Sequence, residues 1–181
     1  MHRSLKLAAL ALAFGASLLA KDTVKVGGRD MFPAKDIVDN AVNSSDHTTL
    51  VAAVKAAGLV DTLKSAGPFT VFAPTNAAFA KLPAGTVDSL LKPDMKNQLM
   101  TVLTYHVVPG KLDFDALAKA IKQGNGRAEL KTVQGGMLTA WMNGMHNIVL
   151  SDAKGGLANI STYDVHQSNG VIHVIDSVVM P

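Results

Sequence analysis

Histidine, serine and aspartate are the residues of this chain that could serve together as a base, a nucleophile and an orienting acid. The combinations would use His106 or His173. Their partners would come from Ser151, Ser161, Ser168, Asp152 and Asp176. A chain of 181 residues offers such triples by chance. The sequence has no Gly-x-Ser-x-Gly elbow, His-Glu-x-x-His pair, Gly-Lys-Ser/Thr loop or dinucleotide fingerprint. It therefore predicts a protein that is not an enzyme.

A second group of residues has the chemistry of a soft metal site. Met142 and Met145 flank Asn-Gly, and His146 follows, so two thioethers and an imidazole could meet at a turn and hold copper. Only one histidine is near, and His47 and His166 have no neighbour at the usual ligand spacing. A defined site needs more ligands than this. We expect no metal and no cofactor, with both methionines as ordinary strand residues.

Trp141, the only tryptophan, is the best candidate for a binding anchor. Strand alternation that turns Leu138 and Ala140 toward a core places Trp141 on the opposite face. An exposed tryptophan there would suit a glycan or protein partner, because aromatic side chains dominate binding energy. Partial burial under a neighbouring loop is the alternative.

Tyr105 and His106 form a dipeptide at an expected helix-to-strand junction. In one interpretation they contact a partner and belong to a binding site. In the other, the tyrosine buries its ring, and the histidine shares hydrogen bonds that orient the turn into Pro109-Gly110. Apolar flanking residues favour the structural interpretation.

Five further residues are expected to specify the fold rather than a function. Thr75 should cap a helix after Pro74, and Asn76 beside it should make local side-chain-to-backbone bonds. His173 lies within an apolar strand and should be a hydrogen-bonded interior group. Asn169 and Asp176 should bond at turns and strand ends.

The elements that position these residues follow from hydrophobic periodicity and turn signals. Helical spacing is predicted over 34–42, 50–57, 59–65, 75–81, 87–91, 94–104 and 113–122. Strand composition is found over 69–73, 127–133, 137–142, 145–150, 157–161 and 171–179. Asn143-Gly144 predicts a two-residue type I′ hairpin turn. Helices dominate the first two-thirds and strands the last third, which indicates an α+β fold.

The N-terminus has the pattern of an export signal over residues 1–20, with Arg3 and Lys6 before an apolar stretch that ends at Ala20. Residues 21–33 read as a flexible entry segment, and 34–181 as the folded domain. Removal of the signal takes away two of 17 basic and none of 14 acidic residues, which lowers the formal net charge from +3 to +1. No basic cluster remains for nucleic acid. The absence of cysteine excludes disulfides and a lipidated cysteine.

Several ordered motifs resemble the fasciclin domain family. They are Thr-Val-Phe-Ala-Pro-Thr-Asn-Ala-Ala-Phe over 70–79, Tyr105-His106, and Asn-Gly-Val-Ile-His-Val-Ile-Asp at 169–176. The resemblance covers about residues 34–181. It implies a β-sandwich or wedge flanked by short helices, with the 70–79 corner and the final strand meeting in one interior. In animal relatives the Tyr-His position has been implicated in receptor contact.

The function implied by the resemblance is binding without catalysis. We expect a secreted or periplasmic bacterial protein that supports adhesion and contacts a protein or polysaccharide at a cell surface or in a matrix. A structural or stress-related protein of the envelope and an unrecognised hydrolase are the alternatives.

Overall fold

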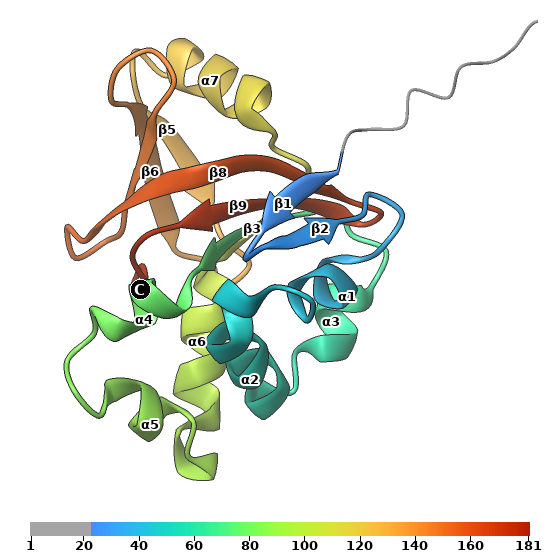
Figure 1. Cartoon of the computed structure of the whole chain (residues 1–181). Coiled ribbons are helices and arrows are strands. Elements are labelled where there is room, and N and C mark those ends of the chain that lie inside the picture. The colour runs from blue at the N-terminus through green and yellow to red at the C-terminus, as the bar shows by residue number, and fades with distance from the viewer. Residues whose placement is uncertain (1–22) are drawn as a thin grey trace, which may run out of the picture.

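Seven strands form one mixed sheet in the computed structural model, which describes residues 23–181 (Figure 1). Their order across the sheet is β4-β3-β9-β8-β7-β6-β5. The strands are β3 (Phe69–Pro74), β4 (Val107–Pro109), β5 (Ala128–Lys131), β6 (Met137–Met142), β7 (Ile148–Ser151), β8 (Leu157–Gln167) and β9 (Gly170–Ile175). The two edge strands of the sheet, β4 and β5, approach each other: the Val133 amide just after β5 donates a hydrogen bond to the Val107 carbonyl of β4 at 2.8 Å. The sheet is thus a nearly closed wedge.

The two central strands come from distant parts of the chain. β3 and β9 pair in parallel, from Phe69 opposite Gly170 to Pro74 opposite Ile175. All of β9 and nearly all of β3 is buried, as expected of strands covered on both faces. The corner after β3 and the last strand therefore meet in one interior, as the family resemblance implied.

Of the seven α-helices among residues 23–181, six lie on one side of β3 and β9, and α7 lies at the opposite end against β5 and β6 (Figure 1). The helices are α1 (Ile37–Ala41), α2 (Thr48–Ala57), α3 (Val60–Lys64), α4 (Asn76–Ala80), α5 (Thr86–Leu90), α6 (Lys96–Tyr105) and α7 (Phe114–Gln123). Two 3₁₀ turns, η1 (Ser45–His47) and η2 (Pro93–Met95), precede α2 and α6. The α+β prediction is confirmed.

Helix ends follow the capping residues that the sequence offers. Thr75 accepts a hydrogen bond from the Ala78 amide at 3.1 Å and so begins α4. Asp113 does the same for α7. Gly58 ends α2 with a φ of 73°, a left-handed conformation that glycine adopts at little cost.

Two hydrophobic clusters form the core. One lies between the helices α1–α6 and the faces of β3 and β9 that carry Val71 and Val174. The other fills the wedge beneath α7 and contains Phe72, Tyr105 and Leu138. Because side chains alternate along a strand, β3 and β9 contribute to both clusters and join them.

The expected flexible entry segment is wrong for most of residues 21–33. Two short strands, β1 (Val24–Val26) and β2 (Arg29–Met31), pair as a hairpin, and Val26 and Met31 are buried. Gly27 and Gly28 have φ values of 58° and 72°, which a two-residue hairpin turn requires. The glycine pair that suggested flexibility is thus a defined turn.

The predicted two-residue turn at Asn143-Gly144 is also wrong. Met142 pairs with Ile148, so residues 143–147 form a five-residue loop. A two-residue turn would pair Met142 with Met145 and turn Ile148 away from the core, because an odd shift in register exchanges the two faces. The observed register keeps Ile148 fully buried and leaves Met145 84% exposed. Burial of the apolar face outweighs the local turn preference.

The proposed export signal at 1–20 lies outside the described residues. Within residues 23–181, no helix has the length and apolar character needed to cross a membrane.

Candidate functional site

Tyr105 joins three parts of the wedge and is fully buried. It ends α6, and its hydroxyl donates to the Met137 carbonyl at 2.6 Å while accepting from the Ala153 amide at 3.2 Å. Burial raises the pKa of the Tyr105 hydroxyl. The ring is therefore a structural connection between α6, β6 and the loop after β7.

His106 is 2% exposed and uses both ring nitrogens internally. Nδ1 lies 2.8 Å from the Val102 carbonyl, and Nε2 lies 3.2 Å from the amide nitrogen of Val179. Since a carbonyl only accepts and an amide only donates, Nδ1 carries the proton and Nε2 accepts. Burial lowers the pKa of His106 to about 4, so the ring is neutral at pH 7.

A partner of the folded domain would not touch the rings of the Tyr105-His106 pair. The binding assignment of these two residues therefore does not fit the described structure. The structural interpretation agrees with their burial, because hydrogen bonds of both side chains lead inward.

His173 is likewise an interior group. Its Nε2 donates to the Leu112 carbonyl at 2.7 Å, and Nδ1 accepts from the Asp164 amide at 3.4 Å. The ring stacks on Phe72 with centroids 5.7 Å apart. Burial lowers its pKa. With both nitrogens engaged, neither His173 nor His106 presents a free base to a substrate in this arrangement.

Asn76 makes long-range bonds where local ones were expected. Its carbonyl oxygen accepts from the Thr49 amide at 3.0 Å, and its amide donates to the Ser45 carbonyl at 2.9 Å. It thus satisfies an otherwise unpaired amide in the first turn of α2, 27 residues away. The prediction of local bonds was wrong because the turn after Pro74 lies against the start of α2.

Asn169 and Asp176 occupy the two ends of β9. Asn169 accepts from the Ile37 amide at 3.1 Å and donates to the carbonyls of Leu63 and Ser65 at 2.7 and 2.9 Å. Asp176 accepts from the backbone and side chain of Asn159, which help to lower its pKa. Both are strand-end hydrogen-bonders, and Asn169 also connects α1 with α3.

Trp141 lies on the face of β6 that points away from the wedge core. Leu138 and Ala140 are fully buried, while Trp141 is partly exposed. The strand register places Val149 beside it on β7, and the guanidinium of Arg127 lies 5.9 Å from the indole centroid. The indole is thus partly buried and partly exposed, between the two alternatives considered for it.

The outer face of β5–β8 surrounds this tryptophan and is the candidate site. Its partly or fully exposed side chains are those of Arg127, Glu129, Lys131, Met137, Thr139, Trp141, Ser151, Leu157 and Asn159. None of the described helices packs on it, since α7 contacts the opposite, core-facing side of β5 and β6. Sequence reasoning found Trp141 and missed Arg127. Only the β5–β6 pairing brings Arg127 to the indole, and that pairing has no local sequence signal.

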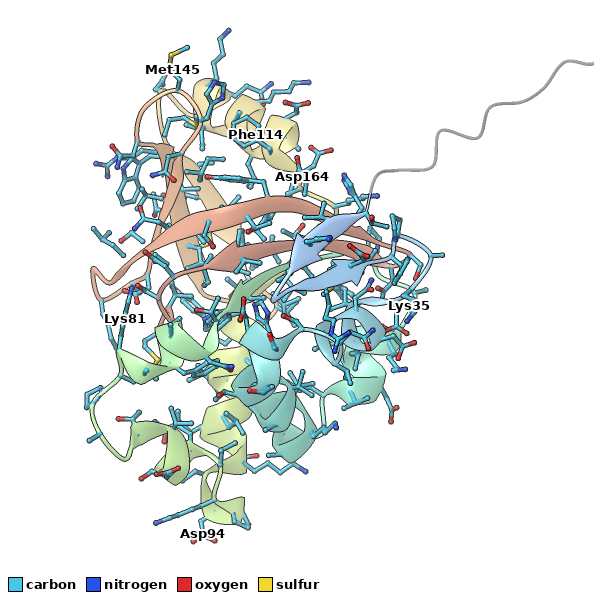
Figure 2. All side chains as sticks on the ribbon, viewed as in Figure 1. Lys35, Lys81, Asp94, Phe114, Met145 and Asp164 are labelled. Carbon is cyan, nitrogen blue, oxygen red and sulfur yellow. The ribbon has the colours of Figure 1, made fainter. Side chains whose placement is uncertain are left out.

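Of the two thioethers weighed as copper ligands, Met142 ends β6 and packs against the second hydrophobic cluster, whereas Met145 is 84% exposed. Met145 lies in the loop between β6 and β7, so its expected place in a strand is wrong. Met145 projects at the same end of the molecule as α7, and the His146 ring lies 6.4 Å from that of Phe114 (Figure 2). Within residues 23–181, no three histidine or acidic side chains gather as metal ligands would.

Comparison with known proteins identifies the fold and the relatives. A family model described as the fasciclin domain matches residues 45–181. Protein sll1483 of Synechocystis is 48% identical over 148 residues, 82% of this chain and 74% of that protein. Immunogenic protein MPB70 of Mycobacterium bovis is 38% identical and is matched over 78% of this chain and 66% of its own length.

Two further matches concern surface proteins. Cell surface glycolipoprotein MPB83 of Mycobacterium bovis is 38% identical over 68% of this chain, which spans 48% of that relative. The solved structure of a FAS1 domain pair from the insect cell adhesion molecule Fasciclin I matches 81% of this chain with a TM-score of 0.70. This chain spans about half of it (51%), and the sequences are 19% identical, so the likeness concerns the fold alone.

Proposed function

The chain belongs to the fasciclin domain family, and from this premise we propose that it is an exported protein that binds a neutral polysaccharide at a cell surface or in a matrix without converting it. Binding would take place on the outer face of β5–β8. The observation that carries the proposal is Trp141 on a sheet face that no described helix covers.

The chemistry of this face fits a sugar polymer. An indole ring offers a flat apolar surface for the C–H face of a sugar, and its stacking would exclude water from both. Thr139 and Ser151 lie opposite each other in the register and supply hydroxyls beside it. Hydroxyl groups donate and accept, so they can pair with sugar hydroxyls in several orientations.

Charge on the face favours a neutral polymer over a charged one. The negative charge of Glu129 partly balances the positive charges of Arg127 and Lys131, so the face carries charges of both signs. The guanidinium of Arg127 lies 5.9 Å from the indole centroid in a cation–π contact, so a sugar would stack on the other face of the ring. A strongly acidic or basic polymer would need a field that this surface lacks.

The relatives support a role outside the cytoplasm. One is named as a cell surface glycolipoprotein, and the fold is shared with an insect cell adhesion molecule. A signal over residues 1–20 would supply the export step. Cell fractionation tests this part: the protein should be found outside the cytoplasmic membrane, and recovery only from the cytoplasm would contradict it.

Binding is tested with immobilised neutral polysaccharides, such as cellulose, laminarin and dextran, and with hyaluronan as a charged comparison. We expect Trp141→Ala to weaken binding to a neutral polymer by about tenfold or more, as loss of an aromatic anchor does. Met145→Ala, on the exposed loop at the edge of the same hairpin, is the matched control and should bind like the original protein. Equal binding by the original protein and Trp141→Ala would rule out this face.

A further inference from the structure

Asparagine is followed by glycine at three places in this chain, at Asn125, Asn143 and Asn169. This pair is prone to deamidation, in which the backbone nitrogen of the glycine attacks the side-chain amide carbon of the asparagine. Glycine favours the attack because it has no Cβ to restrict the backbone or to cover the nitrogen. The reaction needs an asparagine side chain that can turn and a following N–H that holds no hydrogen bond. The sequence makes the three pairs equivalent, so the folded structure decides which of them reacts.

Asn169 is held too firmly to react. It is 7% exposed, and its Oδ1 accepts from the Ile37 amide at 3.1 Å. Its Nδ2 donates to the carbonyls of Leu63 and Ser65 at 2.7 and 2.9 Å. Its side chain would have to give up all of these hydrogen bonds to reach the nitrogen of Gly170, and unpaired buried groups are costly.

Asn125 is exposed, but the nitrogen that follows it is engaged. The Gly126 amide donates to the Ile121 carbonyl at 2.9 Å, just beyond the end of α7. Asn125 itself has a φ of 56°, the left-handed conformation that often ends a helix. The hydrogen bond from Gly126 satisfies a carbonyl of the last helical turn. Gly126 can therefore attack only after this helix end opens.

Asn143 meets both conditions. It is exposed at the start of the loop 143–147, and its side chain makes no hydrogen bond with any residue of 23–181. The Gly144 amide donates to none of these residues either. Gly144 has a φ of 89°, and a Cβ added to it would meet nothing within 4 Å. The nucleophile and the carbon that it attacks thus belong to adjoining residues that neither packing nor hydrogen bonds restrain.

The same loop contains a second asparagine for comparison. The backbone amide of Asn143 closes the loop by donating to the Asn147 carbonyl at 2.7 Å. Asn147 is followed by Ile148, whose amide donates to the Tyr163 hydroxyl at 2.7 Å. Ile148 is also fully buried and β-branched, so its nitrogen is covered as well as engaged. Asn147 is therefore blocked although it lies in the same loop.

We propose that Asn143 is the site at which the folded protein deamidates. The Gly144 nitrogen loses its proton to solvent and forms a bond to Cγ of Asn143. The bond from Cγ to Nδ2 breaks, and Nδ2 takes up one proton and leaves as ammonia. Water then opens the cyclic imide at either carbonyl, which yields aspartate or isoaspartate at position 143. The only co-reactant is water.

The modified chain should stay folded. The Asn143 side chain is exposed and makes no hydrogen bond within residues 23–181, so its replacement by a carboxylate removes no contact of that kind. The register that pairs Met142 with Ile148 does not involve this side chain. The product carries one more negative charge on the loop that also exposes Met145 and His146. The proposal concerns this loop alone and does not depend on polysaccharide binding.

The test is incubation of the purified protein at pH 8.5 and at pH 6, both folded and unfolded in guanidinium chloride, followed by peptide mapping with mass spectrometry. Each deamidated peptide gains the mass that replaces NH₂ by OH. In the unfolded chain the three Asn-Gly pairs should react at comparable rates. In the folded protein Asn143 should keep most of that rate, and the reaction should be faster at pH 8.5, because the attacking nitrogen must lose a proton.

The other asparagines provide internal references. Folding should slow Asn125 about fivefold or more, the factor that corresponds to one net hydrogen bond. Asn169 and Asn147 should remain unmodified while Asn143 reacts. Because each site is compared with itself in the unfolded chain, the ratio reports the effect of the fold and not that of the neighbouring sequence.

Two matched variants identify the source of the acidic form that ion-exchange chromatography separates. Asn143→Gln should remove the early acidic form, because the longer side chain closes its ring far more slowly. Asn125→Gln, at the other exposed Asn-Gly pair, is the control and should form it like the original protein. Asn143→Asp should have the urea midpoint of the original protein, which would show that the charged product persists in the folded state.

Three results would overturn the proposal. They are a folded protein in which Asn125 or Asn169 reacts before Asn143, an Asn143 that folding slows as much as it slows Asn125, and an early acidic form that Asn143→Gln still produces. Both glutamine variants replace exposed side chains, and their urea unfolding curves establish that they are folded before the rates are compared.

Discussion

The backbone amide of Val179 donates a hydrogen bond to Nε2 of His106, 73 residues earlier in the chain. Val179 is fully buried, and His106 also bonds back to Val102 within α6. The segment after β9, which carries Val179 of the second hydrophobic cluster, is therefore fixed to the C-terminal end of α6. This single imidazole joins the last residues of the domain to its middle.

Replacement of His106 by alanine should destabilise the domain. The change leaves the Val179 amide without its acceptor and creates a cavity, which together cost about 2–4 kcal/mol of unfolding free energy. Urea unfolding followed by tryptophan fluorescence measures this. His146→Ala, in an exposed loop, is the control with little expected effect. A His106→Ala variant as stable as the original protein would contradict the structural role.

Stability should also fall when the pH is lowered from 6.5 to 4. An unfolded histidine has a pKa near 6.5, whereas folded His106 has a pKa of about 4. The unfolded chain therefore binds the extra proton first, and stability that is fully present above pH 6.5 is lost toward pH 4. The His106 share is roughly 3 kcal/mol. His47 and His173, whose pKa values are also lowered by burial, act in the same direction.

Unfolding free energies from urea titrations at pH 7.5, 5.5 and 4.5 check this dependence. Folded carboxylates with lowered pKa values, such as Asp176, contribute mainly below this window. His106→Ala should show a smaller loss over the same range, because it lacks the contribution of this histidine. A stability that does not change between pH 7.5 and 4.5 would show that the buried histidines accept protons without cost.

Much of this fold is visible in local sequence patterns. The capping residues Thr75 and Asp113 and the C-terminal Gly58 mark helix ends that the structure confirms. The parallel β3–β9 pair, by contrast, joins residues about a hundred positions apart, and only the family resemblance indicated it. Local sequence patterns predict helix ends because capping is a contact between residues that are near neighbours in the chain.

The features that sequence reasoning missed depend on distant contacts. Asn76 caps α2 from 27 residues away, and Arg127 reaches Trp141 through strand pairing. The Asn143-Gly144 turn was mispredicted since local turn preference competes with burial of Ile148.

Asn169→Ala should be among the more damaging polar substitutions. Asn169 is only 7% exposed. Its side chain makes hydrogen bonds with one backbone amide of α1 and with two backbone carbonyls at the end of α3. Their loss leaves buried backbone groups unpaired and should cost about 2–4 kcal/mol. Asn143→Ala, an exposed asparagine, is the matched control. Equal urea midpoints for the two variants would refute this account.

The hairpin that begins the domain offers a test with two neighbouring glycines. Gly27 and Gly28 both have positive φ, so alanine at either should cost about 1–2 kcal/mol of backbone strain. At Gly27 a Cβ atom would also lie 2.6 Å from Ser44 Oγ and 2.8 Å from the Asp46 amide nitrogen, whereas at Gly28 nothing lies within 4 Å. Gly27→Ala should therefore be the more destabilising change.

Urea unfolding of Gly27→Ala and Gly28→Ala measures the difference directly. Because the backbone strain is shared, the excess loss in Gly27→Ala reports the contact between the hairpin and the Ser45–His47 turn. Hydrogen exchange of the Val26 and Met31 amides should rise in the same variant, since the hairpin packs on the core through these residues. Equal losses of unfolding free energy in the two variants would mean that the hairpin can move away from η1 at no cost. The contact with η1 would then not stabilise the hairpin turn.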